Sequence, residues 1–127
     1  MAIPIYESAE DYLEAILIIQ NQKGVAHSVD IADHLHYSKA SVSVAMKKLR
    51  ENGYISMEKD GSLKLLEPGR EIAERIYERH QVLTDYFISI GVDEETAAKD
   101  ACKVEHDLSE QTFEKMKADF RSRKLNS

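Results

Sequence analysis

The stretch SVDIADHLHYSKASVSVAMKKLRENGYISMEKDGSLKLL, residues 28–66, decides the fold class. Its first half carries apolar residues at helical spacing on both sides of His36-Tyr37-Ser38, which predicts two short helices over about 28–35 and 39–51 joined by a tight turn. In its second half, apolar and polar residues alternate on both sides of Lys59-Asp60-Gly61. An Asp-Gly pair between two such alternating runs predicts a β-hairpin. Two short helices followed by a hairpin are typical of a winged helix-turn-helix.

The flanking sequence predicts only helices. Upstream, Ser8 is a candidate cap for a helix that Gly24 ends, and Ser28 is the next candidate cap. Downstream, Glu67-Pro68-Gly69 starts a long helix that reaches Gly91, because proline is tolerated in a first helical turn. Two further helices are expected, one starting after Val92 and one capped by Ser109.

We therefore predict a mainly α protein: a winged helix-turn-helix with a β-hairpin wing over residues 1–66, followed by a helical dimerisation domain over residues 67–127. The broad apolar stripes of the second half suit packing against another subunit. The tail from Arg121 to Ser127 has no apolar face and is expected to fray.

Composition excludes several classes of protein. The chain has 127 residues, 43% of them hydrophobic, and a single cysteine, so it is globular and has no disulfide framework. The start Met1–Tyr6 lacks the features of a signal peptide, and no apolar run approaches the roughly 18 residues of a membrane span. We expect a soluble, cytoplasmic protein that does not enter a membrane.

The charge is unevenly distributed. The net charge is −6, yet residues 36–64 hold six basic and three acidic side chains, a local +3. A polyanionic partner would therefore meet this segment, whereas the acidic remainder suits cations.

In a winged helix-turn-helix the second of the two short helices enters the major groove and the hairpin reaches the flanking backbone. Short hydroxyl side chains near the helix start suit phosphate contacts, lysines add charge, and Ala40 and Val44 are expected to face outward. The candidate DNA-binding residues are Ser38, Lys39, Ala40, Ser41, Ser43, Val44, Lys47, Lys48 and Lys59. The alternative is a solvated basic helix in a small helical domain.

Three groups of residues are candidates for a cation site. Asp11 and Glu14 lie three apart in the first helix and share a face. Cys102, Glu105 and His106 are spaced i, i+3 and i+4, and His80 lies in the long helix. The mixture of carboxylate, imidazole and thiolate suits manganese, iron, cobalt or zinc better than calcium.

Each group also has a structural interpretation. Acidic pairs are commonly solvated helix surface, a single cysteine is commonly a small buried apolar residue, and His80 is equally compatible with a core histidine.

The order of these elements resembles the diphtheria-toxin-repressor family of metal-dependent transcriptional repressors. The resemblance rests on the winged helix, on Glu78-Arg79-His80 and on the run from Ala101 to Ser109. The segment Glu10–Ile16 is similar to the first helix of the manganese-transport-regulator branch, and the chain ends where iron-dependent members add an SH3-like domain, as in the shorter branch.

The resemblance implies a metal site for one or two ions, a homodimer formed through the C-terminal helices, and binding of palindromic operator DNA upstream of metal-uptake genes. The implied ligands are Asp11, Glu14, His80, Cys102, Glu105 and His106. Cysteine at 102 is an iron-type feature and Asp11 a manganese-type feature, so manganese or iron are favoured and zinc or cobalt stay open. Thr84 and Ala98 stand where the iron branch has ligands of a separate ancillary site, which we do not expect here.

Two rival functions remain at this point. One is a winged-helix regulator that responds to an organic ligand or a partner protein and has no metal site. The other is an enzyme with Cys102 and His106 as nucleophile and base, which we do not expect, because a helix-interior cysteine lacks an open approach and no glycine-rich oxyanion loop is recognisable.

Overall fold

The computed structural model describes residues 7–125, and these residues form two compact units that divide between Arg75 and Ile76. The division falls within one long helix. The predicted boundary between residues 66 and 67 stays a prediction, and the prediction about Met1–Tyr6 lies outside the described residues. No helix within residues 7–125 is long and apolar enough to cross a membrane.

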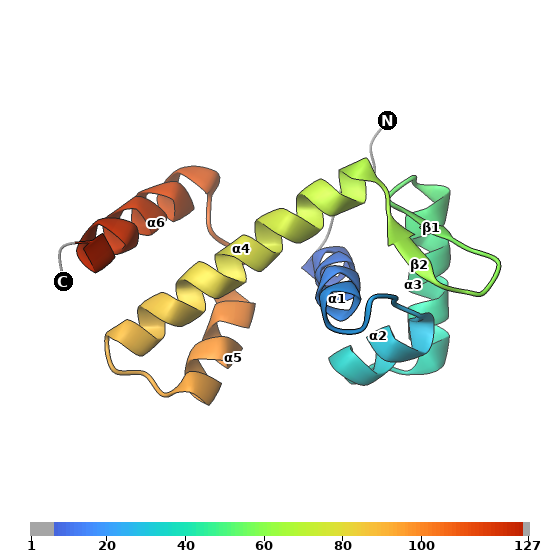
Figure 1. Ribbon diagram of the computed structural model, residues 1–127, viewed down its shortest axis with the longest axis horizontal. Helices are drawn as coiled ribbons and strands as arrows, with labels where there is room; N and C mark the ends of the chain where they lie inside the picture. The colour runs from blue at the N-terminus through green and yellow to red at the C-terminus, as the bar shows by residue number, and fades with distance from the viewer. Residues whose placement is uncertain (1–6, 126–127) are drawn as a thin grey trace. The chain divides into compact units, whose positions relative to one another are not determined.

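The first unit holds three helices and a hairpin (Figure 1). Its elements are α1 (Glu7–Lys23), α2 (Ser28–Leu35), α3 (Lys39–Glu51), β1 (Ile55–Met57), β2 (Leu63–Leu65) and the start of α4 (Glu67–Ser89). The strands pair antiparallel, with Ile55 opposite Leu65 and Met57 opposite Leu63. Ala26 extends this small sheet, because Leu63 N–H donates to its carbonyl at 2.7 Å. The predicted helices, turn and hairpin of the winged helix-turn-helix are confirmed, with shorter strands than the alternating pattern indicated.

The core of the first unit is made by one face of each helix together with the hairpin. Its fully buried side chains are Leu13, Ile16, Ile31, Val42, Met46, Ile55 and Leu63. Burying side chains of this size is the main favourable term that holds the three helices and the wing together.

The second unit contains the remainder of α4, then α5 (Glu94–Val104) and α6 (Glu110–Leu125). Asp93 caps α5 by accepting a hydrogen bond from Thr96 N–H at 3.0 Å, and Ser109 caps α6 in the same way through Thr112 N–H at 3.1 Å. The rings of Tyr86 in α4 and Phe120 in α6 meet edge to face, with centroids 6.0 Å apart.

Two predicted helix caps are wrong. Ser8 lies inside α1, which begins at Glu7. Ser28 is the first residue of α2, and its N-cap is His27, whose N–H donates to the Asp30 carboxylate at 2.9 Å. In a capping box, an acidic side chain three positions after the N-cap accepts a hydrogen bond from the N-cap backbone N–H. Asp30 does this for His27, although the usual N-cap residue of this motif is serine or threonine.

The predicted fraying of the C-terminal tail is also wrong for residues 121–125, because α6 continues to Leu125. Arg123 pairs with Asp119 at 3.0 Å, and the Lys124 ammonium lies 5.3 Å from the centre of the Phe120 ring. These contacts one turn apart stabilise a helix end without an apolar face. Asn126 and Ser127 lie outside the described residues.

Candidate DNA-binding surface and metal centre

The outward face of α3 holds the predicted DNA-binding residues. Ser38 caps the helix, and its hydroxyl oxygen accepts from Ser41 N–H at 3.1 Å. Val42, Met46 and Leu49 point into the core, which leaves the opposite face to solvent. The exposed residues there are Lys39, Ala40, Ser41, Ser43, Val44, Lys47 and Lys48. Val44 is 56% exposed, so its predicted outward orientation is confirmed, whereas contact with DNA stays a prediction.

The hairpin is held in a tight conformation at its tip. Gly61 has a φ of +86°, which glycine adopts without strain, and Ser62 N–H donates to the Asp60 carboxylate at 2.9 Å. Hydrogen bonds from Ser62 hold the pKa of Asp60 below its ordinary value. Lys59 is exposed beside this turn, whereas Lys64 pairs with Glu58 at 3.6 Å. Lys59 is thus the wing lysine that presents an exposed charge at the tip.

The turn before α3 contains a contact that the sequence did not indicate. His36 adopts a left-handed conformation (φ 60°), and the ring of the next residue, Tyr37, meets Tyr12 of α1 edge to face at 5.8 Å. Burial raises the pKa of Tyr12, and Tyr37 and Asp11 raise it further. This contact links the helix that carries Asp11 to the start of the helix that carries the DNA-binding residues.

Asp11 and Glu14 lie in α1, in the first unit. Asp11 is half-buried and Glu14 is buried. Their neighbour Glu10 pairs with Arg75 at 2.9 Å, which joins α1 to the first part of α4 within the same unit. A buried carboxylate costs desolvation free energy, so Glu14 is unusual for a helix surface and compatible with a ligand role.

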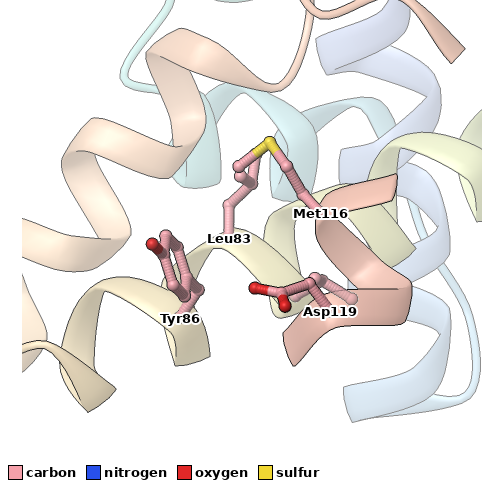
Figure 2. A pocket seen from close by; sticks show the side chains of 5 residues that line it. Leu83, Tyr86, Met116 and Asp119 are labelled. Carbon is pink, nitrogen blue, oxygen red and sulfur yellow. The ribbon is translucent and has the colours of Figure 1, made fainter. Parts of the chain in front are cut away.

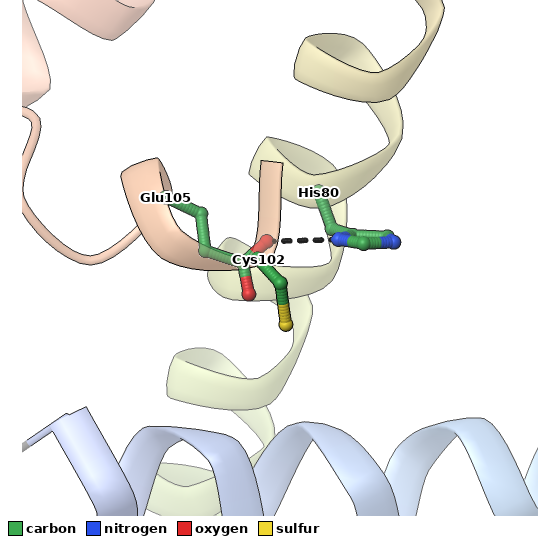
Figure 3. A group of neighbouring side chains, drawn as sticks. All are labelled: His80, Cys102 and Glu105. Carbon is green, nitrogen blue, oxygen red and sulfur yellow. Dashed lines mark hydrogen bonds and ion pairs between the residues drawn. The ribbon is translucent and has the colours of Figure 1, made fainter. Parts of the chain in front are cut away.

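The other four candidate ligands lie in the second unit, and three of them form a cluster (Figure 3). His80 Nδ1 lies 3.0 Å from Glu105 Oε2, and the Cys102 thiol projects beside them. Nitrogen, sulfur and oxygen ligand atoms of the three residues lie within 4.8 Å of one another. Neighbouring ligand atoms of one ion at bond lengths of 2.0–2.3 Å lie about 3–4 Å apart, so the three side chains could bind a divalent transition metal by drawing closer together.

The prediction that Cys102, Glu105 and His106 share one helical face is only partly correct. The helix α5 ends at Val104, so Glu105 is its C-cap and His106 lies in the turn that follows. Glu105 keeps helical dihedral angles (φ −58°, ψ −26°) and its N–H still donates to Ala101, which preserves the spacing to Cys102. His106 Nε2 lies 3.6 Å from Glu105 Oε1.

Cys102 is exposed and Glu105 is fully buried. The interpretation of Cys102 as a small buried apolar residue is therefore wrong, since the thiol is accessible. His80 is half-buried and directed at a carboxylate, which is the arrangement of a polar site and not of a core histidine.

Arg79 was not singled out by the sequence. It is 6% exposed, and its guanidinium donates to the main-chain carbonyls of Glu105 at 3.0 Å and Leu108 at 2.7 Å. A charged residue directly before a candidate ligand is a weak signal by itself, because arginine is common on helix surfaces.

A small pocket lies between α4 and α6 (Figure 2). It is lined by Val82, Leu83, Tyr86, Met116 and Asp119. One carboxylate among mainly apolar side chains does not make a set of converging ligands, so this pocket is not part of the candidate metal centre.

Comparison with known proteins addresses both units. Residues 5–63 match the family described as iron dependent repressor, N-terminal DNA binding domain, and residues 66–124 match the iron dependent repressor, metal binding and dimerisation domain. The HTH-type transcriptional regulator MntR of Geobacillus kaustophilus (strain HTA426) is 39% identical over 102 residues, which cover 80% of this chain and 72% of that protein.

Two further proteins are similar to this chain and agree with the family match. An uncharacterized HTH-type transcriptional regulator of Methanocaldococcus jannaschii is 34% identical over 113 residues, covering 87% of this chain and 90% of that protein. A solved manganese-dependent transcriptional repressor in complex with manganese has the same fold, with a TM-score of 0.80, 24% identity and coverage of 88% of this chain. This chain spans 52% of that solved repressor, about half its length.

Members of the matched family are transcriptional repressors that depend on a metal and are not enzymes, so the predictions of a regulator, of a metal effector and of the winged-helix fold are confirmed at the level of the family. The two matches together span most of the described residues, and the chain belongs to the iron-dependent repressor family.

Proposed function

We propose that this protein is a cytoplasmic repressor of metal-uptake genes, whose homodimer binds operator DNA when a divalent metal joins its two units. The observation that carries the proposal is the cluster of His80, Cys102 and Glu105 in a chain that matches both the DNA-binding and the metal-binding domain of one repressor family.

The proposed ligands are Asp11 and Glu14 from α1, together with His80, Cys102, Glu105 and His106 from the second unit. A bound divalent ion would supply positive charge that offsets the repulsion among three carboxylates. Two or more carboxylates favour manganese or iron, whereas the Cys102 thiolate favours softer ions such as zinc or cobalt.

The proposed DNA contacts come from α3 and the wing. The exposed hydroxyls of Ser38 and Ser41 lie at the N-terminus of α3, where backbone N–H groups and the helix dipole favour phosphate. We propose that the exposed Val44 contacts a thymine methyl group and that Lys47, Lys48 and Lys59 contact phosphates. Ser43 and Ala40 complete this face.

The proposed homodimer explains how a bound ion alters DNA binding. A two-fold dimer presents two α3 helices, and palindromic half-sites one helical turn apart require them to be separated by roughly 34 Å. Ligands from α1 and from the second unit couple the orientation of the DNA-binding unit to metal occupancy. Metal affinity and DNA affinity are then reciprocally coupled.

The direct test is DNA binding measured with and without metal. Duplexes selected from a random pool by the metal-loaded protein serve as probes, and fluorescence anisotropy is followed during titration with Mn²⁺, Fe²⁺, Co²⁺ and Zn²⁺. We expect at least tenfold tighter binding with the physiological ion, within the range of about 5- to 150-fold of typical allosteric couplings.

Variants test the ligand assignment. Glu14→Ala combined with His106→Ala should reduce metal stoichiometry and abolish the metal response. Glu95→Gln is the matched control, because Glu95 is exposed on α5 and its carboxylate pairs with Lys99 one helical turn away at 3.2 Å. Equal DNA affinity with and without every ion would favour a regulator that responds to an organic ligand or a partner protein.

A further inference from the structure

We propose that Arg79 is a positioning residue of the metal centre: its guanidinium holds the turn that carries Glu105 and His106 in the geometry that binds metal. The proposal rests on the function proposed above and adds to it a residue outside the set of ligands.

The contacts of Arg79 converge on the turn after α5. Its Nη1 atom donates to the carbonyl oxygens of Glu105 at 3.0 Å and of Leu108 at 2.7 Å. These oxygens belong to residues on both sides of the turn, so one charged group bridges its two ends. The side chain is 6% exposed, and hydrogen bonds from a buried charged donor are stronger than those between neutral groups.

The chemistry of helix ends explains why a cation is needed here. The last carbonyls of a helix have no intrahelical N–H partner, and basic side chains commonly satisfy them. The helix α5 ends at Val104, directly before the Glu105 carbonyl that Arg79 contacts. A planar guanidinium with several donors serves two carbonyls at once, which a lysine ammonium does with less defined geometry.

The position of Arg79 in the sequence links the turn to a ligand. Arg79 and His80 are consecutive residues of α4. Arg79 holds the main chain of Glu105, while His80 Nδ1 lies 3.0 Å from its carboxylate. Two consecutive residues of α4 therefore hold both the backbone and the side chain of Glu105. Movement of the turn after α5 would separate Glu105 from His80 and Cys102.

Arg79 also has a contact that is purely structural. Its guanidinium carbon lies 5.2 Å from the centre of the buried Phe113 ring of α6. Lys117 makes a similar contact, with its ammonium 5.6 Å from the same ring, and pairs with Glu78 at 3.0 Å. Lys117 also pairs with Glu114 at 3.2 Å. Lys117→Met therefore removes a cation–π contact and two ion pairs in the same unit while leaving the turn untouched, which makes it the matched control.

The experiment compares Arg79→Met, Arg79→Lys and Lys117→Met in the full chain with the unsubstituted protein. The first measurement is amide hydrogen exchange of the metal-free protein. We expect Arg79→Met to accelerate exchange of the amides in residues 105–109 selectively, and Lys117→Met to leave them unchanged. This measurement involves no metal, so it decides the role of Arg79 on the turn even if the protein binds no ion.

The second measurement is titration with Co²⁺, followed by its visible absorption. Loss of a group that orients a ligand reduces metal affinity by about 10- to 100-fold, which we expect for Arg79→Met, with an altered spectrum at saturation. Arg79→Lys should recover part of the Co²⁺ affinity. If Arg79→Met does not fold, Arg79→Lys is compared with the unsubstituted protein in its place. Unchanged exchange in residues 105–109, or an equal loss of Co²⁺ affinity in Lys117→Met, would overturn the proposal.

Discussion

Replacing Gly69 by alanine should destabilise the protein, although the same change in an ordinary helix is stabilising. Gly69 is buried in the first turn of α4, and a Cβ atom there would overlap the carbonyl oxygen of Tyr54. That oxygen already accepts a hydrogen bond from Leu66 N–H at 3.0 Å, and Cδ2 of Leu13 would lie 3.3 Å from the added carbon. The strand β1 and the start of α4 would have to separate.

The expected magnitude follows from two opposing terms. Alanine is favoured over glycine in a helix interior by about 1 kcal/mol. Extra atoms in a packed core cost about 1–3 kcal/mol, and the upper end applies because the obstacle is backbone and not the flexible end of a side chain. We expect a net loss of about 2 kcal/mol in the free energy of unfolding, or roughly 8–16 °C in the melting temperature of a domain of this size.

Urea denaturation followed by circular dichroism measures this change in the metal-free protein. Glu71→Ala, at an exposed position two residues further along α4, is the control and should alter stability by no more than about 0.5 kcal/mol. Because β1 belongs to the wing, the Gly69 variant should also bind DNA more weakly. A Gly69→Ala protein as stable as the unsubstituted one, or more stable, would refute the steric argument.

Three further changes have defined outcomes. Val44→Glu should weaken DNA binding about tenfold or more, because it places a carboxylate at the proposed groove-facing surface. The free energy of unfolding in urea should change by about 0.5 kcal/mol or less, because the site is exposed. An unchanged DNA affinity in the anisotropy titration would show that α3 does not contact DNA. Cys102→Ser should remove the near-ultraviolet thiolate-to-metal absorption of the Co²⁺-loaded protein, and persistence of that band would exclude the thiolate as a ligand. Asp30→Asn should cost about 1 kcal/mol near pH 6, because the His27 backbone N–H and then Lys23 lower the pKa of Asp30 from its ordinary 3.8. Since the folded pKa of Asp30 is the lower one, this stability is present above about pH 4 and is lost as pH falls through the folded value. The difference in stability between the two proteins should therefore shrink as the pH is lowered below about 4, and a difference that does not change with pH would contradict the linkage.

Much of the fold was predictable because its signals are local. The hairpin turn at Asp60-Gly61 and the helix start after the turn at His36-Tyr37-Ser38 each depend on hydrogen bonds within three residues along the chain. The cap of α2 was missed because a histidine takes the place of the usual serine, and its partner Asp30 was recognisable only once the helix start was known. The extension of α6 was missed because it depends on side-chain pairs and not on an apolar face.

The metal centre was predictable in its residue types and only partly in its geometry. The spacing of Cys102 and Glu105 predicted their proximity, and the helical phase between them is kept. It did not show that α5 ends before Glu105, nor that His80, from a different helix, would lie 3.0 Å from its carboxylate.

The sequence by itself determined the order of helices and hairpin, the outward face of α3 and the chemical nature of the candidate ligands. These depend on periodicity and on turn residues, which act between neighbours in the chain. Only the tertiary structure decided that Tyr12 meets Tyr37, that Gly69 lies against Tyr54 and that Arg79 holds the turn at Glu105. Each of these contacts joins residues 15 or more positions apart. Their distances are set by how whole elements pack around a shared core, and no local pattern carries that information.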